Sequence, residues 1–119
     1  MKKTLVLGAT TNADRYAYLA ANKLVKYGHP IINVGMKPGE VAGVPIELPE
    51  KIHTDIDTIT LYVGPKNQPP LYDYIFQTNP KRVVFNPGAE NLELEKMLEE
   101  KGVQTEEACT LVMLSTGQY

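Results

Sequence analysis

The chain has 119 residues, of which 43% are hydrophobic and 22% are charged, and its formal net charge is -2. This length suits one domain over residues 1–119, with a single core. The net charge is close to zero and the sequence has no run of basic residues, which disfavours nucleic acid or an anionic membrane as a partner. No apolar stretch approaches the roughly 20 residues that cross a bilayer. The apolar run before Gly8 is also too short for a secretory signal, so we expect a cytoplasmic protein.

The first elements are expected to form a strand–helix–strand unit. Residues 4–8 form an apolar run that ends in glycine, and residues 31–34 form a second run. Between them, small and apolar side chains recur at the spacing of one helix face: Ala17, Ala20, Ala21, Leu24 and Val25. We expect Asp14 to cap this helix and Gly28 to end it.

The segment 35–54 is rich in glycine and proline, so we expect it to be mostly loop, with a short extended piece at 44–46. The elements expected after it are a strand at 58–63, a helix from about Pro69 to before Pro80, a strand at 82–85, a helix between Asn91 and Gly102, a strand at 103–105 and a short helix within 109–119.

Continuous apolar strands that alternate with helices predict a parallel sheet covered on both faces. The expected fold is therefore α/β and Rossmann-like: a doubly wound, mostly parallel five-stranded sheet with helices on both faces. In such sheets, ligands bind beyond the carboxyl ends of the strands. Those ends are expected at Gly8, Gly35, 63–65 and 86–88, and each carries glycine or proline.

The loop after the first strand is a candidate phosphate site. Backbone N–H groups at Gly8 and Ala9, with the side chains of Thr10 and Asn12, supply hydrogen-bond donors at the start of a helix. Arg15 follows and could form a forked bond to a phosphate. The loop has one glycine and so lacks the G-x-G-x-x-G fingerprint of dinucleotide sites. The alternative is an ordinary strand–helix turn with an exposed arginine.

Lys37 occupies the end of the second strand, where NAD enzymes carry an acidic residue that binds the ribose. The absence of an acidic residue at this position disfavours NAD as the ligand. A lysine here suits a phosphorylated ribose, either the 3′-phosphate of coenzyme A (CoA) or the 2′-phosphate of NADP. The alternative is a solvated surface lysine.

Two further strand ends and the segment after the last strand carry candidate residues. Val63 and Pro65 could form an apolar wall for a ligand, and Asn86 with Gly88 could meet a ligand amide. A plain turn, in which Asn86 bonds its own backbone, is the alternative there. Cys109 is either a buried small hydrophobe or a thiol placed near a thiol ligand.

Together these residues resemble the small single-domain CoA-binding proteins of bacteria and archaea, which are related to the CoA-binding N-terminal domain of the succinyl-CoA synthetase alpha subunit. The resemblance covers nearly the whole chain. The similar positions are Gly8-Ala9-Thr10, Asn12, Arg15, the turn 34–38, the tripeptide 43–45 and Cys109. The resemblance implies CoA as the ligand.

The chain departs from that family's pattern near its carboxyl end. Residues 85–88 read Phe-Asn-Pro-Gly where the family usually has Trp-x-Gln-x-Gly, and residues 110–113 replace its usual Pro-Lys segment. The region between the second and third strands is also trimmed. These departures concern the part of the site where the thiol end of CoA would lie.

The sequence contains no nucleophile–base pair beside the candidate site. We therefore expect a stand-alone CoA or acyl-CoA binding protein without a complete catalytic apparatus. One alternative is a small NADP-dependent oxidoreductase or subunit. Another is a regulatory protein that senses acyl-CoA and acts on a protein partner. A homo-oligomer is compatible with each of them.

Overall fold

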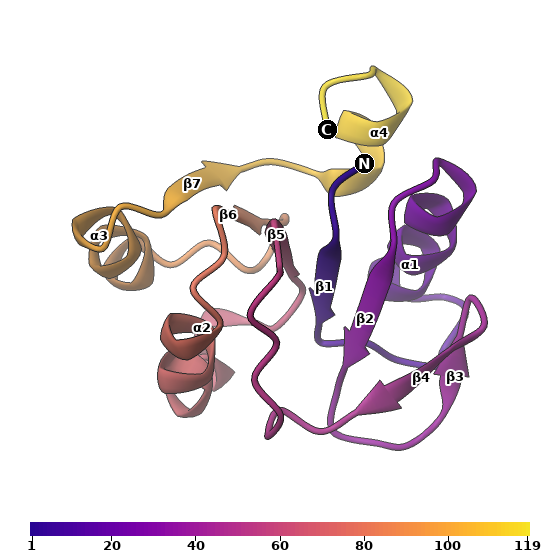
Figure 1. Cartoon of the computed structure of the whole chain (residues 1–119), viewed down its shortest axis with the longest axis horizontal. Coiled ribbons are helices and arrows are strands. Elements are labelled where there is room, and N and C mark those ends of the chain that lie inside the picture. Colours follow the sequence, from indigo (N-terminus) through magenta and orange to yellow (C-terminus); the bar gives the residue numbers. More distant parts are fainter.

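The structure, a computed structural model, describes all 119 residues and shows an open sheet with helices on both sides (Figure 1). The strands are β1 (Thr4–Leu7), β2 (Ile31–Val34), β3 (Glu40–Val41), β4 (Val44–Glu47), β5 (Thr58–Leu61), β6 (Arg82–Phe85) and β7 (Gln104–Glu107). Their order is β3-β4-β2-β1-β5-β6-β7, and only the β3–β4 pair is antiparallel. The predicted α/β fold with a mostly parallel sheet is confirmed.

The predicted number of five strands is wrong, because the sheet has seven. The two extra strands form a hairpin within the segment 35–54, which we expected to be mostly loop. β4 coincides with the short extended piece expected at 44–46, whereas β3 was not expected. Ala42 and Gly43 have φ angles of 55° and 79°, the conformation of a tight hairpin turn. The hairpin is too short to leave a hydrophobic period in the sequence, and β4 pairs with β2 over only two residue pairs.

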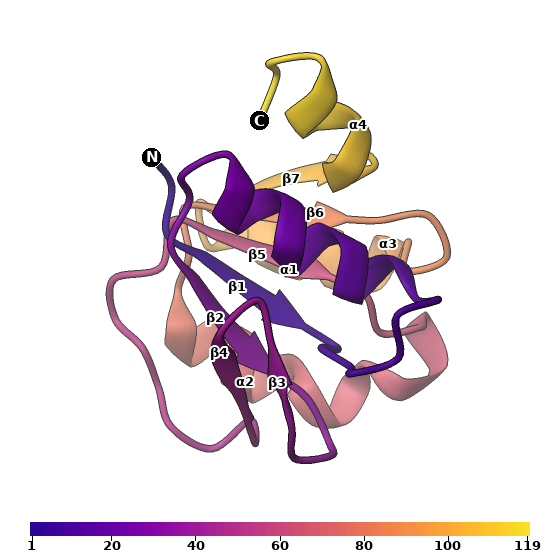
Figure 2. The ribbon, with the colours of Figure 1, turned by 90° about the vertical axis from the view of Figure 1, so that its right-hand side faces the viewer.

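The helices are α1 (Tyr16–Lys26), α2 (Tyr72–Thr78), α3 (Leu92–Glu100) and α4 (Thr110–Ser115). Figure 2 shows α1 in front of the sheet and α2 behind it. Apolar side chains of α1 and α4 pack on one face of the sheet, while those of α2 and α3 pack on the other. Two 3-10 turns, Pro65–Asn67 and Pro69–Leu71, precede α2, so this helix starts later than predicted. No helix is long and apolar enough to cross a membrane.

The helix ends follow the expected caps with one exception. The Asn91 side chain accepts a hydrogen bond from Leu94 N, and Gly28 and Gly102 adopt positive φ angles after their helices. The exception is the start of α1. Arg15, not Asp14, is the residue before its first turn, and no side chain caps it. The backbone N–H of Asp14 instead bonds the Asn12 side chain.

The strand order reverses direction at β1. From β1 the chain moves outward through β2 to the hairpin, and it then returns to β5 on the other side of β1. The connection after β1 leads to α1 on one face, whereas the connection after β5 leads to α2 on the opposite face. Loops that diverge in this way leave a crevice at the carboxyl ends of β1 and β5, where open α/β sheets bind ligands.

Candidate ligand-binding site

The loop after β1 is held tightly against the neighbouring strands. Gly8 N and Ala9 N both donate to Val34 O at 2.9 Å. Gly8 has a φ angle of 101°, and a side chain there would lie 3.1 Å from the Tyr62 backbone. Glycine is therefore needed both for the turn and for the close approach to β5. The N–H groups of Gly8 and Ala9 are committed to the protein, so phosphate donors have to come from further along the loop.

Gly35 acts through its lack of a side chain. A Cβ atom at this position would lie 2.4 Å from Ala9 O, closer than any nonbonded contact allows. The end of β2 can thus approach the loop after β1 only because residue 35 is glycine. The candidate role of Gly35 is therefore to let the loops after β1 and β2 meet at the edge of the sheet.

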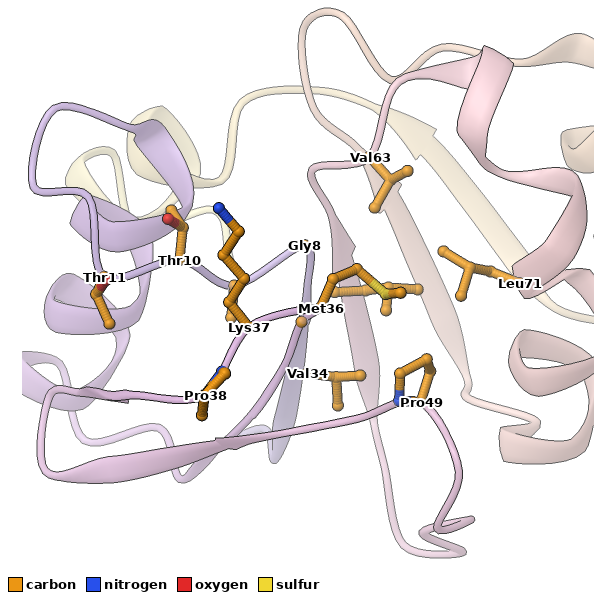
Figure 3. A pocket seen from close by; sticks show the side chains of 13 residues that line it. Gly8, Thr10, Thr11, Val34, Met36, Lys37, Pro38, Pro49, Val63 and Leu71 are labelled. Carbon is orange, nitrogen blue, oxygen red and sulfur yellow. The ribbon is translucent and has the colours of Figure 1, made fainter.

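A hollow of about 290 Å³ opens on one side of the loop after β1 (Figure 3). Lys37 and Thr10 stand on one side of it, and Val63 and Leu71 lie on the other. Six of the predicted site residues line this hollow: Gly8, Ala9, Thr10, Gly35, Lys37 and Val63. The hollow therefore joins apolar walls to an exposed ammonium group.

A second hollow of about 300 Å³ lies on the other side of the same loop. Gly8 and Thr10 line both hollows, so the two are neighbours. The remaining residues of the second hollow come from the first turn of α1 and from the ends of β5 and β6: Arg15, Tyr16, Ala17, Tyr62 and Pro87.

The start of α1 offers free hydrogen-bond donors to this second hollow. The backbone N–H groups of Tyr16 and Ala17 have neither a backbone nor a side-chain acceptor. Free donors at a helix N-terminus, together with the helix dipole, form an anion site. The exposed Arg15 adds a guanidinium at the same place. This part of the site suits a phosphate or diphosphate.

The side chains of Thr10 and Asn12 shape the loop between the hollows. Thr10 Oγ1 accepts a hydrogen bond from Asn12 N at 3.1 Å, and Asn12 Oδ1 accepts one from Asp14 N at 3.0 Å. These local turns fix the loop before α1 and leave the first N–H groups of the helix free. Thr10 also lines both hollows, whereas Asn12 lines neither.

Asn86 has a different role from the predicted one. Its side chain is only 1% exposed and lines neither hollow. Its Nδ2 atom donates to Thr60 Oγ1 and Leu61 O at 2.8 and 3.0 Å, and its Oδ1 atom accepts from Thr110 N at 2.9 Å. The amide therefore joins β5, β6 and α4 inside the protein and has no group left for a ligand.

Pro65 and Gly88 are exposed and lie outside both hollows. In their places the structure brings Tyr62 and Pro87 to the second hollow. Each is adjacent in sequence to a predicted residue. The predicted strand ends thus indicated the right loops but not always the residue in each loop that faces the crevice.

Cys109 is half-buried and precedes the first turn of α4. It lines neither hollow, although it lies near the Tyr62 hydroxyl. Burial raises the pKa of Tyr62 to about 12, and the charge on the Cys109 thiolate adds to this effect. Tyr62, which lines the second hollow, therefore stays protonated at neutral pH.

Cys109 gives a test of where the thiol end of a CoA ligand lies. Because the thiol is half-buried, we expect a small neutral thiol reagent to label the native protein slowly. Saturating CoA should slow this labelling further if the ligand passes Tyr62. Cys109→Ser should leave CoA affinity within about twofold of wild type, since Cys109 lines neither hollow. Equal labelling rates with and without CoA would place the thiol end elsewhere.

The fold and the two hollows define an α/β domain with a candidate anion site at the carboxyl edge of its sheet. The chain belongs to the CoA-binding domain family, whose model, described as "CoA binding domain", matches residues 2–115. This confirms the resemblance that the sequence indicated. No curated protein matches the chain. No group of three or more His, Cys, Asp or Glu side chains is arranged to hold a metal ion.

Several solved structures share the fold. The crystal structure of an uncharacterized protein is 53% identical, with a TM-score of 0.98, over 100% of this chain and 98% of the other. A structure from Thermus thermophilus is 21% identical, with a TM-score of 0.85, over 99% and 90% of the two chains. A hypothetical protein from Pyrococcus horikoshii OT3 is 24% identical, with a TM-score of 0.83, over 97% and 82%.

Proposed function

We propose that this single domain binds CoA or an acyl-CoA at the carboxyl edge of its sheet, without a complete catalytic apparatus of its own. The observation that carries the proposal is the start of α1. The N–H groups of Tyr16 and Ala17 are unpaired, and both residues line one hollow together with Arg15. Family membership supports CoA as the ligand that supplies the anion.

The diphosphate of CoA fits the second hollow on electrostatic grounds. Two free N–H donors and the positive end of the helix dipole favour a negative group there. Arg15 can add a charge-assisted hydrogen bond, which is about twice as strong as a neutral one. No acidic residue lines this hollow, so nothing in it repels a phosphate.

The adenosine end of CoA fits the first hollow. Val34, Val63 and Leu71 give it apolar walls on which a base can pack. Lys37 lines the same hollow, and no Asp or Glu does. A phosphate on the ribose therefore meets an ammonium group here, whereas the bare ribose of NAD finds no carboxylate. The pantetheine arm would then leave along Tyr62 and Pro87 in the second hollow.

A thermal-shift comparison tests the proposal. A ligand that binds only the folded protein at 100 times its Kd stabilises it by about 2.7 kcal/mol. We expect CoA and acetyl-CoA to raise the Tm, and NAD at equal concentration to raise it less. A larger shift with NADP than with CoA would favour the small oxidoreductase instead. A shift with NAD and none with CoA would refute CoA binding.

A further inference from the structure

The turn that carries Lys37, residues 35–39, is fixed at both ends by one strand. Gly35 N donates to Glu47 O at 3.0 Å, and Ile46 N donates to Gly39 O at 2.8 Å. Both partners are consecutive residues of β4. The position of the Lys37 turn therefore depends on where β4 lies.

The same turn also contacts the loop after β1. A Cβ atom at Gly39 would lie 2.3 Å from Thr11 Cγ2, and one at Gly35 would lie 2.4 Å from Ala9 O. Figure 3 shows the Lys37 side chain extending beside Thr10. The turn is thus held between β4 and the loop after β1, and Lys37 projects from it over the first hollow.

Asn33 on β2 holds the hairpin that contains β4. Its side chain is completely buried, and its Nδ2 atom donates to Val41 O at 3.0 Å and to Val44 O at 3.1 Å. These two carbonyls flank the hairpin turn at Ala42 and Gly43. Because β4 pairs with β2 over only two residue pairs, these two bonds add to a short ladder, beside the packing of Val41 in the core.

The Asn33 Oδ1 atom is buried and has no hydrogen-bond partner. An unpaired buried oxygen costs stability, so stability alone does not explain an amide at this position. Its two N–H bonds to the hairpin are the contribution that an apolar residue of the same size could not make. The structure therefore shows a polar residue whose useful contacts all go to the hairpin that holds the Lys37 turn.

We propose that Asn33 is a positioning residue for ligand selectivity: through the β3–β4 hairpin it holds Lys37 where a phosphate on the ligand ribose binds. This rests on the proposed CoA site. Asn33 touches no ligand itself. Its effect falls on the part of the affinity that depends on the ribose phosphate, because the Lys37 turn is bonded directly to β4, whereas α1 shares with the hairpin only a hydrophobic cluster that β1, β2 and α4 also hold.

The test is a double-mutant cycle measured by calorimetric titration with CoA and with 3′-dephospho-CoA. Lys37→Ala should weaken CoA binding about fivefold, the size of an exposed charge pair, and leave 3′-dephospho-CoA binding unchanged. Asn33→Leu should reproduce this ligand-selective loss. In the Lys37→Ala background, Asn33→Leu should add less than about a twofold change, since coupled residues are not additive.

Two further variants keep the result interpretable. Thr78→Val removes another buried polar group, on α2 away from the site, and should change neither affinity. Gly43→Val strains the hairpin turn, where φ is 79° and the surrounding space is open, and should give the same selective loss even if Asn33→Leu fails to fold.

The outcomes separate the two proposals. If wild type binds no CoA, the proposed function fails. If wild type prefers CoA over 3′-dephospho-CoA, but Asn33→Leu and Gly43→Val leave that preference intact, the role of Asn33 is refuted. An equal loss for both ligands would also refute it, since it would show a general effect on the structure.

Discussion

Replacing Arg15 by alanine is expected to weaken CoA binding by about 1.5–3 kcal/mol, or roughly 10- to 150-fold in Kd. Arg15 is exposed beside the unpaired N–H groups of Tyr16 and Ala17, so its main interaction is with the ligand. Folding stability should change by less than about 0.5 kcal/mol, because the side chain makes no hydrogen bond or ion pair within the protein. Calorimetric titration measures the first effect and chemical denaturation the second.

Lys26→Ala provides the matched control for Arg15→Ala. Lys26 is an exposed cation in the last turn of the same helix, so the variant removes the same charge far from both hollows. Its CoA affinity should stay near wild type. If Arg15→Ala and Lys26→Ala have equal effects on Kd, Arg15 contributes only general charge, and the diphosphate does not bind at the start of α1.

Asn86→Leu is expected to give the largest loss of stability, about 3–4 kcal/mol in the free energy of unfolding. The substitution removes four side-chain hydrogen bonds inside the protein, the longest of them to Val84 O at 3.5 Å. It leaves Thr110 N without a partner and Leu61 O with only the long bond from Asn86 N at 3.4 Å. Each buried group left unpaired costs about 1–3 kcal/mol. Urea denaturation with an unchanged m-value would measure this loss.

The control for Asn86→Leu is the same substitution at an exposed site. Asn22 on α1 is exposed and donates a single side-chain bond, to Tyr18 O. Asn22→Leu should change stability by less than about 0.5 kcal/mol. A similarly small effect of Asn86→Leu would show that this amide is not a structural bridge and would reopen its role as a ligand contact.

The regular part of the fold could be predicted because its signals are local. The small side chains of α1 recur on one face, Asn91 caps α3, and Gly28 and Gly102 end their helices as expected. The hairpin at 40–47 could not be predicted in the same way. It is bonded to Asn33, whose two bonds to Val41 O and Val44 O become visible only when β2 and the hairpin are placed together.

The site could be predicted at the level of loops. Parallel strands end at one edge of the sheet, and so the residues after β1 and β2 were expected to meet; Thr10 and Lys37 do line one hollow. The direction of each side chain was not predictable. Asn86 turns inward to Thr60 and Thr110, while its neighbour Pro87 lines the second hollow.

The most direct test of a CoA site at this edge of the sheet is an NMR titration of the ¹⁵N-labelled protein with CoA. Amide shifts should saturate at one CoA per chain. The largest changes should fall on the loop after β1, the first turn of α1 and the Lys37 turn, residues 8–12, 16–17 and 35–37. The absence of saturable shifts, or shifts centred on α3 and β7 instead, would contradict CoA binding at the carboxyl ends of β1 and β5.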